Sequence, residues 1–181
     1  MFIPLIEKRR SIRKFQKKRI EAEKIDILVE AALRPPSSRG LQPWEFVLVS
    51  KTDLLDKLSK AREYGSGFLK DAQLAIVVCA DPKKTDVWVE DSSIAAVFIQ
   101  LAAESIGLGS CWVQVRERMH DASKTASAYV SDILNIPSDL TVECMIGVGY
   151  PDEQKPPHKK EELAYKKVHQ NGYGNAYAAS K

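Results

Sequence analysis

The sequence predicts a single α+β domain, in which helices and β-strands are combined along one chain. Its 181 residues have the length of one domain and are enough to bury a core. Apolar residues recur with helical spacing in some segments, such as residues 21–34, and form continuous strand-like runs in others, such as residues 74–80. Hydrophobic residues make up 44% of the chain and charged residues 28%, which is an ordinary globular composition. We therefore expect one domain over residues 1–181, without internal repeats.

A strongly basic stretch, residues 8–19, follows a short helix that we predict for residues 2–9. Eight of its twelve residues are Lys or Arg, in a chain whose formal net charge is only +3. Three guanidinium groups match phosphate oxygens in geometry and charge. They belong to Arg9, Arg10 and Arg13. Ser11 adds a hydroxyl donor, and the apolar Ile12 and Phe15 interrupt the charges, which favours an ordered anion site. The alternatives are a charged helix face and a nucleic-acid patch.

A proline-bounded loop follows the amphipathic helix predicted for residues 21–34. The helix ends at a Pro-Pro pair, because proline cannot continue the hydrogen-bond ladder. The loop, residues 36–44, contains two hydroxyls, a glycine and an amide, which are groups that can approach a planar ligand closely. An ordinary connecting turn is the alternative.

Two strands and a helix are predicted next. Residues 45–50 have the composition of a strand, and Thr52 is expected to be the N-cap of a helix that ends near residue 62. Residues 63–70 contain two glycines and are expected to form a loop. Residues 74–80 are continuously apolar, which predicts a central strand that is covered on both faces.

The longest helix is predicted for residues 89–106, and its apolar residues on more than one side indicate burial all round, as in a central or an interface helix. After a glycine-rich turn we expect a strand at residues 111–115, a helix at 122–134 and a strand at 141–148. The polar, proline-rich residues 152–181 are expected to form an extended arm.

The cysteine and histidine patterns argue against disulfides and metals. The cysteines are scattered in strand-like runs, which favours buried free thiols in a reducing compartment. They are Cys79, Cys111 and Cys144. The histidines show no metal-ligand spacing, so no metal is expected. No signal peptide or membrane-length apolar run is evident, and the expectation is a cytoplasmic protein without a membrane partner.

Four short motifs follow one another along the chain. They are Arg9-Arg10-Ser11-Ile12-Arg13-Lys14-Phe15, Pro36-Ser37-Ser38 with Gln42-Pro43-Trp44, Ala95-Ala96 with Gly107-Leu108-Gly109-Ser110-Cys111-Trp112, and Gly147-Val148-Gly149-Tyr150-Pro151. Each is weak alone. Together, their order and spacing over residues 2–170 resemble those of the FMN-dependent nitroreductase family, in particular its smaller members.

The resemblance implies a mixed, mainly antiparallel sheet flanked by helices, and an intertwined homodimer with FMN at its interface. The FMN phosphate and ribityl chain are implied to meet Arg9, Arg10, Ser11 and Arg13. The flavin is implied to face Pro36, Ser37, Ser38 and Gln42 of the other subunit. The backbone implied to pass near the flavin ring is that of Cys111, Trp112 and Val113. A second phosphate contact is implied for Lys159 or Lys160.

The activity implied by the resemblance is that of an oxidoreductase. NADH or NADPH passes a hydride to flavin N5 and leaves, and a nitroaromatic, quinone or similar planar acceptor then takes the electrons, which gives ping-pong kinetics. Because the flavin carries the chemistry, no catalytic residue is nominated on the protein.

Two departures from the family pattern stand out. Gly40 occupies a position where many members have asparagine. Gly65 and Phe68 occupy a region where many larger members carry a polar residue and a lysine that reach the pyrimidine end of the flavin. We expect a backbone N–H or Arg39 to substitute there.

Three other functions remain open. A non-catalytic FMN-binding or redox-sensing protein carries the same flavin-holding motifs. A dehalogenating or flavin-fragmenting enzyme of the same fold usually has lid segments, and no such insertion is evident. A nucleic-acid module is least favoured, because one basic stretch and a net charge of +3 make a small footprint.

Overall fold

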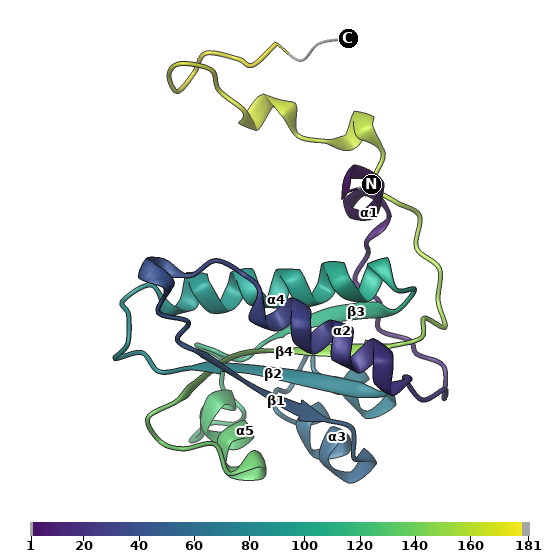
Figure 1. Ribbon diagram of the computed structural model, residues 1–181, viewed down its shortest axis with the longest axis vertical. Coiled ribbons are helices and arrows are strands. Elements are labelled where there is room, and N and C mark those ends of the chain that lie inside the picture. The colour runs from purple at the N-terminus through teal and green to yellow at the C-terminus, as the bar shows by residue number, and fades with distance from the viewer. Residues whose placement is uncertain (1, 179–181) are drawn as a thin grey trace.

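The computed structural model describes residues 2–178 (Figure 1). Its strands are β1, Trp44–Val49; β2, Leu74–Ala80; β3, Gly109–Gln114; and β4, Thr141–Gly149. Its α-helices are α1, Phe2–Lys8; α2, Ala22–Leu33; α3, Thr52–Ser59; α4, Trp88–Ser105; and α5, Ala126–Leu134. Short 3-10 helices lie at Ser38–Gly40, Gly67–Asp71, Lys160–Glu162 and Tyr165–Lys167.

The four strands form one antiparallel sheet in the order β1-β2-β4-β3. The helices α2 and α4 cover one face, and α3 and α5 cover the other (Figure 1). Every residue of the central strand β2 is buried, because its apolar side chains face helices on both sides. A parallel bridge between Ser11 and Ser110 adds a mixed element at the β3 edge. The predicted α+β class is confirmed.

Two predicted helix starts were wrong for local reasons. Lys51 is the N-cap of α3, and Thr52 is already its first helical residue. The helix expected from residue 122 begins only at Ala126, with Thr125 as its N-cap. Before it, Oδ1 of Asp121 accepts two backbone N–H groups, at 2.7 and 2.8 Å, which holds the segment in a turn.

In a single chain, the long helix α4 is buried on its inner side only, so of the two predicted environments, a central helix or an interface helix, the structure excludes the first. Ala96 and Ile99 are completely buried toward the sheet. On the outer side, Ile94, Val97 and Phe98 are 39%, 47% and 38% exposed. The all-round apolar pattern therefore marks an apolar surface of the single chain, a feature typical of interaction sites.

The three cysteines are buried free thiols, as predicted. Burial raises the pKa of Cys79 to about 11 and that of Cys144 well above its ordinary value. Both thiols are therefore protonated at neutral pH and are poor nucleophiles.

Two glycines allow the basic stretch to pack directly on the end of the sheet. A Cβ atom at Gly109 would lie 2.9 Å from Cβ of Ile12, and one at Gly149 would lie 2.9 Å from Cδ1 of Phe15. Both apolar side chains are only 7% exposed. Ile12 and Phe15 thus anchor the backbone that carries the charges between them.

Gly109→Ala is expected to lower the free energy of unfolding by about 1–3 kcal/mol, because the new methyl group overlaps the base of the Ile12 side chain. Gly67→Ala is the matched control, since a Cβ atom there meets nothing within 4 Å. Chemical denaturation of both variants measures the difference. Equal losses in the two would contradict the described packing of Ile12.

The C-terminal arm, which begins at residue 152, leaves the sheet after β4 and runs past α1, away from the rest of the domain (Figure 1). Residues 156–178 are exposed throughout. The last three residues of the expected arm, 179–181, lie outside the described residues. Within the part of the chain that the structure describes, none of the helices combines the length and hydropathy needed to cross a membrane.

Candidate cofactor site

From residue 9 onward the basic stretch is an extended segment at the sheet edge. Ser11 bridges to Ser110 of β3, and the Ile12 N–H donates to the Ser110 carbonyl at 3.0 Å. On the other side, the Lys14 carbonyl accepts from the Asp152 N–H at 2.9 Å. The alternative of a charged helix face is therefore wrong.

Two side chains of the arm hold the same segment in place. Oε1 of Glu153 accepts from the N–H groups of Arg13 and Lys14, at 2.5 and 3.2 Å. Nζ of Lys155 donates to the Ser11 carbonyl at 2.5 Å and pairs with the Glu153 carboxylate at 3.2 Å. Sequence analysis missed both residues, because only their alternating charges marked them.

The guanidinium groups of the basic stretch have different surroundings. Arg10 donates to the carbonyl of Pro156 and so anchors the arm. Arg9 and Arg13 form no ion pair with a carboxylate within residues 2–178. The guanidinium groups of Arg9 and Arg13 therefore remain available to an anion. The predicted Lys159 and Lys160 lie further along the exposed arm.

The outer edge of β3 is only partly covered. In an antiparallel strand, both backbone polar groups of a residue point to one side, and the sides alternate. Ser110 faces outward, since its carbonyl accepts from Ile12, and Gln114 faces outward, since its carbonyl accepts from Nη1 of Arg62 at 3.1 Å. Trp112 lies midway and therefore presents its N–H and C=O to the outer edge, where its carbonyl accepts a long hydrogen bond, 3.5 Å, from Sγ of Cys111. A planar polar ligand can hydrogen-bond there.

The neighbours of Trp112 face away from the open edge. Cys111 and Val113 direct their backbone polar groups toward β4, and their side chains are 1% exposed. Only the backbone of Trp112, among these three predicted residues, is placed to pair with a ligand at the edge.

Charges of the basic stretch converge on this edge. Burial raises the pKa of the Cys111 thiol. Four groups oppose that rise: the charge of Arg13, a hydrogen bond with Ser11, and the charges of Lys155 and Arg9. These groups act on one buried sulfur because they lie around it. The structure thus brings together the chief predicted residues of the N-terminal motif and β3.

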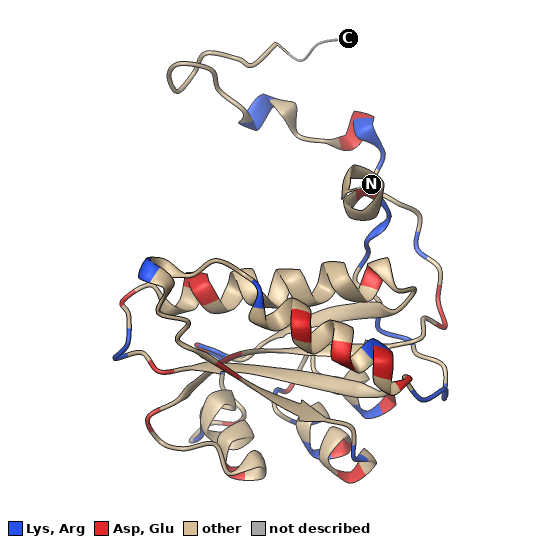
Figure 2. Ribbon diagram, in the orientation of Figure 1, with Lys and Arg blue, Asp and Glu red and all other residues tan. Residues whose placement is uncertain are grey.

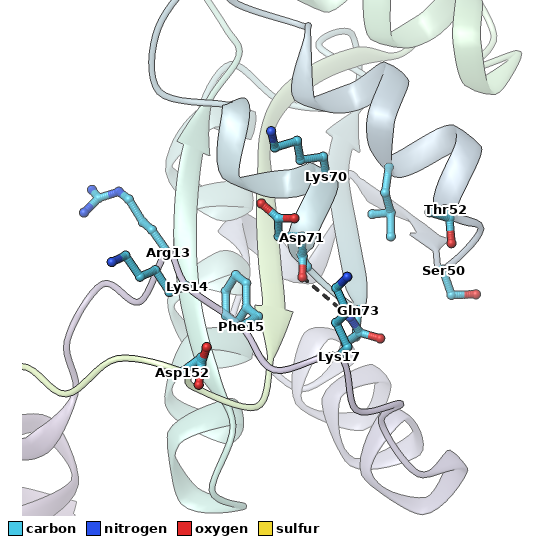
Figure 3. Close-up of a pocket in the computed structure, with 12 residues that line it drawn as sticks. Arg13, Lys14, Phe15, Lys17, Ser50, Thr52, Lys70, Asp71, Gln73 and Asp152 are labelled. Atoms are coloured by element: carbon cyan, nitrogen blue, oxygen red, sulfur yellow. Dashed lines mark hydrogen bonds between the residues drawn. The ribbon is translucent and has the colours of Figure 1, made fainter.

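A cavity of about 500 Å³ shares Arg13 with this site (Figure 3). Its other basic residues are Lys14 and Lys17, which belong to the basic stretch, and Lys70, which lies outside the predicted motifs. Lys70 comes from the 3-10 helix before β2, across the Phe15 ring from Arg13 (Figure 3). The acidic residues of the lining, Asp71 and Asp152, balance only half of these charges.

The proline-bounded loop is held by a buried carboxylate of α4. The Ser38 N–H donates to Oδ1 of Asp91 at 2.9 Å, and Oγ of Ser37 accepts from the Gln42 N–H at 3.0 Å. Gly40 has φ of +67°, a left-handed conformation that asparagine tolerates better than most residues. Glycine at position 40 is therefore compatible with this backbone conformation.

One chain does not bring this loop and the basic stretch together. The loop is tied to the start of α4 at Asp91, whereas Lys8 is tied to the end of α4 by a 3.4 Å ion pair with Glu104. The helix between Asp91 and Glu104 is about 20 Å long at 1.5 Å per residue. Lys and Arg residues near α1 are seen at the opposite end of α4 from the loop in Figure 2. A site made of both parts needs the loop of a second copy.

This α+β domain, with a cationic segment beside an open strand edge, has the features of a protein that holds a planar, phosphate-bearing cofactor. A family model described as the Nitroreductase family matches residues 6–63 and 57–150. The chain belongs to the nitroreductase family, and the prediction that it is an enzyme of this family is confirmed.

Similar proteins agree with this family. A protein of Archaeoglobus fulgidus named as an NADH dehydrogenase/NAD(P)H nitroreductase is 37% identical over 157 residues, which cover 84% of this chain and 87% of the relative. The solved FMN-dependent nitroreductase of Clostridium difficile has a TM-score of 0.93 and 50% identity, covering 94% and 99% of the two chains. The NADPH:FMN oxidoreductase of Vibrio harveyi, solved with NAD⁺, has a TM-score of 0.80 and 26% identity, covering 97% of this chain and 79% of that one.

Glu153→Ala is expected to destabilise the protein by about 1 kcal/mol at neutral pH, because two backbone N–H groups lose their acceptor. The Arg13 N–H, more than the Lys155 charge, lowers the pKa of Glu153 in the folded state. A pKa that is lowered in the folded state stabilises the protein at pH values above the ordinary carboxyl pKa. This stabilisation is lost as the pH falls through the pKa of the folded state. The difference in the free energy of unfolding between wild type and variant should therefore shrink in acid.

Denaturation of both proteins across this pH range measures that difference, with Glu161→Ala as an exposed control. A difference in the free energy of unfolding that did not depend on pH would contradict the ionised contact.

Proposed function

We propose that this protein is an FMN-dependent oxidoreductase that uses NADH or NADPH to reduce nitroaromatic, quinone or similar planar acceptors by ping-pong hydride transfer. The observation that carries the proposal is the outward-facing backbone of Trp112 on the strand edge that the basic stretch borders at Ser110. Within residues 2–178, Arg9 and Arg13 of that stretch form no ion pair with a carboxylate. The cofactor and the electron donor are supported by the names of the similar proteins, which include FMN-dependent and NAD(P)H nitroreductases.

The residues present fit FMN. A phosphate and ribityl chain suit the charge-assisted donors of the basic stretch, which are Arg9, Ser11 and Arg13. The polar edge of the ring suits the backbone of Trp112. A partner subunit's loop would add Pro36, Ser37, Ser38 and Gln42, and the arm would add Lys159 or Lys160. Arg10 serves mainly as an anchor of the arm through Pro156.

The protein's part in the chemistry is to bind and orient. When bound, FMN supplies the hydride-accepting atom and the electrons for the acceptor. Ile12 and Phe15, fixed on the sheet, hold the phosphate-binding backbone rigid. The buried Cys111 remains a neutral thiol at this edge, since burial raises its pKa. No side chain is assigned as a proton donor.

We propose further that the active form is a homodimer. The helices α1, α2 and α4 together expose large apolar side chains on one chain. These are Phe2, Ile3, Ile6, Ile27, Leu33, Ile94, Val97 and Phe98. A cavity of about 370 Å³ between these helices, lined by Phe2, Leu5 and Phe98, offers a place for side chains of a second copy. Such pairing supplies the loop that one chain cannot bring to its own basic stretch.

The proposal is tested on the purified protein by its visible spectrum, by identification of the released chromophore, and by oxidation of NADH or NADPH with a quinone or a nitroaromatic. Bound FMN and parallel double-reciprocal plots are expected. A protein that takes up no FMN would contradict the proposal. FMN binding without turnover would favour the alternative of a non-catalytic flavin-binding protein.

A further inference from the structure

Arg62 is a partly buried cation that has no charged partner among residues 2–178. Its Nη1 donates to the backbone carbonyl of Gln114 at 3.1 Å. It forms no ion pair with Asp or Glu within the described residues. A guanidinium has five N–H donors. One neutral acceptor therefore leaves its charge and most of its donors available to an anionic or polar ligand.

A compact turn fixes the backbone from which this side chain extends. The fully buried Ser66 hydroxyl accepts from the Arg62 N–H at 3.2 Å and donates to the Ser59 carbonyl at 2.7 Å. Gly65 has φ of +91°, and a Cβ atom there would lie 3.7 Å from Nη1 of Arg62. The missing side chain at Gly65 thus leaves space directly beside the guanidinium.

Arg62 lies at the opposite end of the open β3 edge from the phosphate-binding groups. The basic stretch covers this edge at Ser110, and Arg62 covers it at Gln114. These two residues are about 13 Å apart along the strand, with the outward-facing backbone of Trp112 between them. A ligand whose phosphate meets the basic stretch therefore extends its planar end toward Arg62.

We propose that Arg62 binds the N1 and O2 atoms at the pyrimidine end of the FMN ring and raises the redox potential of the bound flavin, an inference that rests on the proposed function. Hydride transfer to N5 adds two electrons, and the resulting negative charge is concentrated at N1 and O2. A cation beside these atoms stabilises the reduced flavin more than the oxidised one.

This assignment also accounts for the departure from the family pattern at Gly65 and Phe68. The Phe68 ring lies 6.3 Å from the Phe15 ring, between centroids, and packs against the core, so it offers the flavin no polar group. Gly65 offers no side chain. The guanidinium of Arg62 supplies, from a different position in the sequence, the positive charge that relatives place in this region.

The test compares wild-type holoenzyme with Arg62→Gln, Arg62→Lys and Arg62→Ala. Glutamine can still donate to the Gln114 carbonyl but carries no charge, whereas lysine retains the charge. The two measurements are the Kd of the apoprotein for oxidised FMN and the two-electron midpoint potential of the bound flavin. Lys60→Ala, which removes an exposed cation paired with Asp56, is the control.

In Arg62→Gln and Arg62→Ala, we expect binding of reduced FMN to weaken about tenfold more than binding of oxidised FMN, which lowers the midpoint potential by about 30 mV. Arg62→Lys and Lys60→Ala should stay near the wild-type potential. A wild-type potential in Arg62→Gln would overturn this assignment, even if FMN affinity fell. Absence of FMN binding by the wild type would instead overturn the proposed function.

Discussion

Val97→Asp is expected to convert the proposed homodimer into monomers and to abolish FMN retention. Val97 is 47% exposed in the middle of the apolar outer face of α4. A carboxylate that becomes buried in an apolar interface without a partner costs several kcal/mol, and association is lost. The monomer keeps its own core, since the inner face of α4 is untouched. It loses the cofactor because the loop of residues 36–42 no longer reaches the basic stretch of another subunit.

Size-exclusion chromatography with light scattering, together with the flavin absorbance of the eluted protein, measures both effects. Met119→Asp is the control, because Met119 is 51% exposed but belongs to none of the three helices of the proposed interface. A Val97→Asp protein that remained dimeric and yellow would show that this face of α4 is not the interface.

Arg9→Ala is expected to weaken FMN binding by about 1.5–3 kcal/mol, which corresponds to a Kd roughly 10–150 times higher. Arg9 is partly buried, lies close enough to influence the Cys111 thiol, and forms no carboxylate ion pair within residues 2–178. Its removal therefore deletes a charge-assisted contact to phosphate without breaking a described ion pair.

Titration of the apoprotein with FMN at constant ionic strength measures this loss. Arg19→Ala removes an exposed arginine of the same basic stretch and serves as the matched control. If Arg9→Ala and Arg19→Ala bound FMN equally well, Arg9 would have no place in the site.

Local periodicity predicted the elements of this fold well. The unbroken apolar run of β2 and the helical spacing of α2 are properties of adjacent residues, and the structure places both elements close to the predicted ranges. For the outer face of α4, the sequence left two environments open, the core and an interface. An apolar residue buried in the core and one destined for an interface have the same composition, and sequence periodicity does not distinguish them.

Some residues of the candidate site could not be predicted from the sequence, because they are joined by contacts between distant parts of the chain. The Arg13 N–H and the Glu153 carboxylate are separated by 140 residues, and Arg62 and the Gln114 carbonyl by 52. No motif joins either pair, because each contact exists only once the strands have paired. Arg9, Ser11 and Arg13 could be nominated from the sequence because they lie within one short motif.

The central claim is that each FMN site is shared by two subunits, and a mixed dimer tests it most directly. One subunit carries Arg9→Ala with Arg13→Ala, and the other carries Ser38→Tyr, whose bulk fills the loop's side of the site. Each homodimer is expected to lose FMN. If the basic stretch of one subunit works with the loop of its partner, the mixed dimer regains one intact site and binds one FMN per dimer. A mixed dimer that binds no FMN, while the wild-type dimer binds two, would place both halves of the site in the same chain and contradict the account.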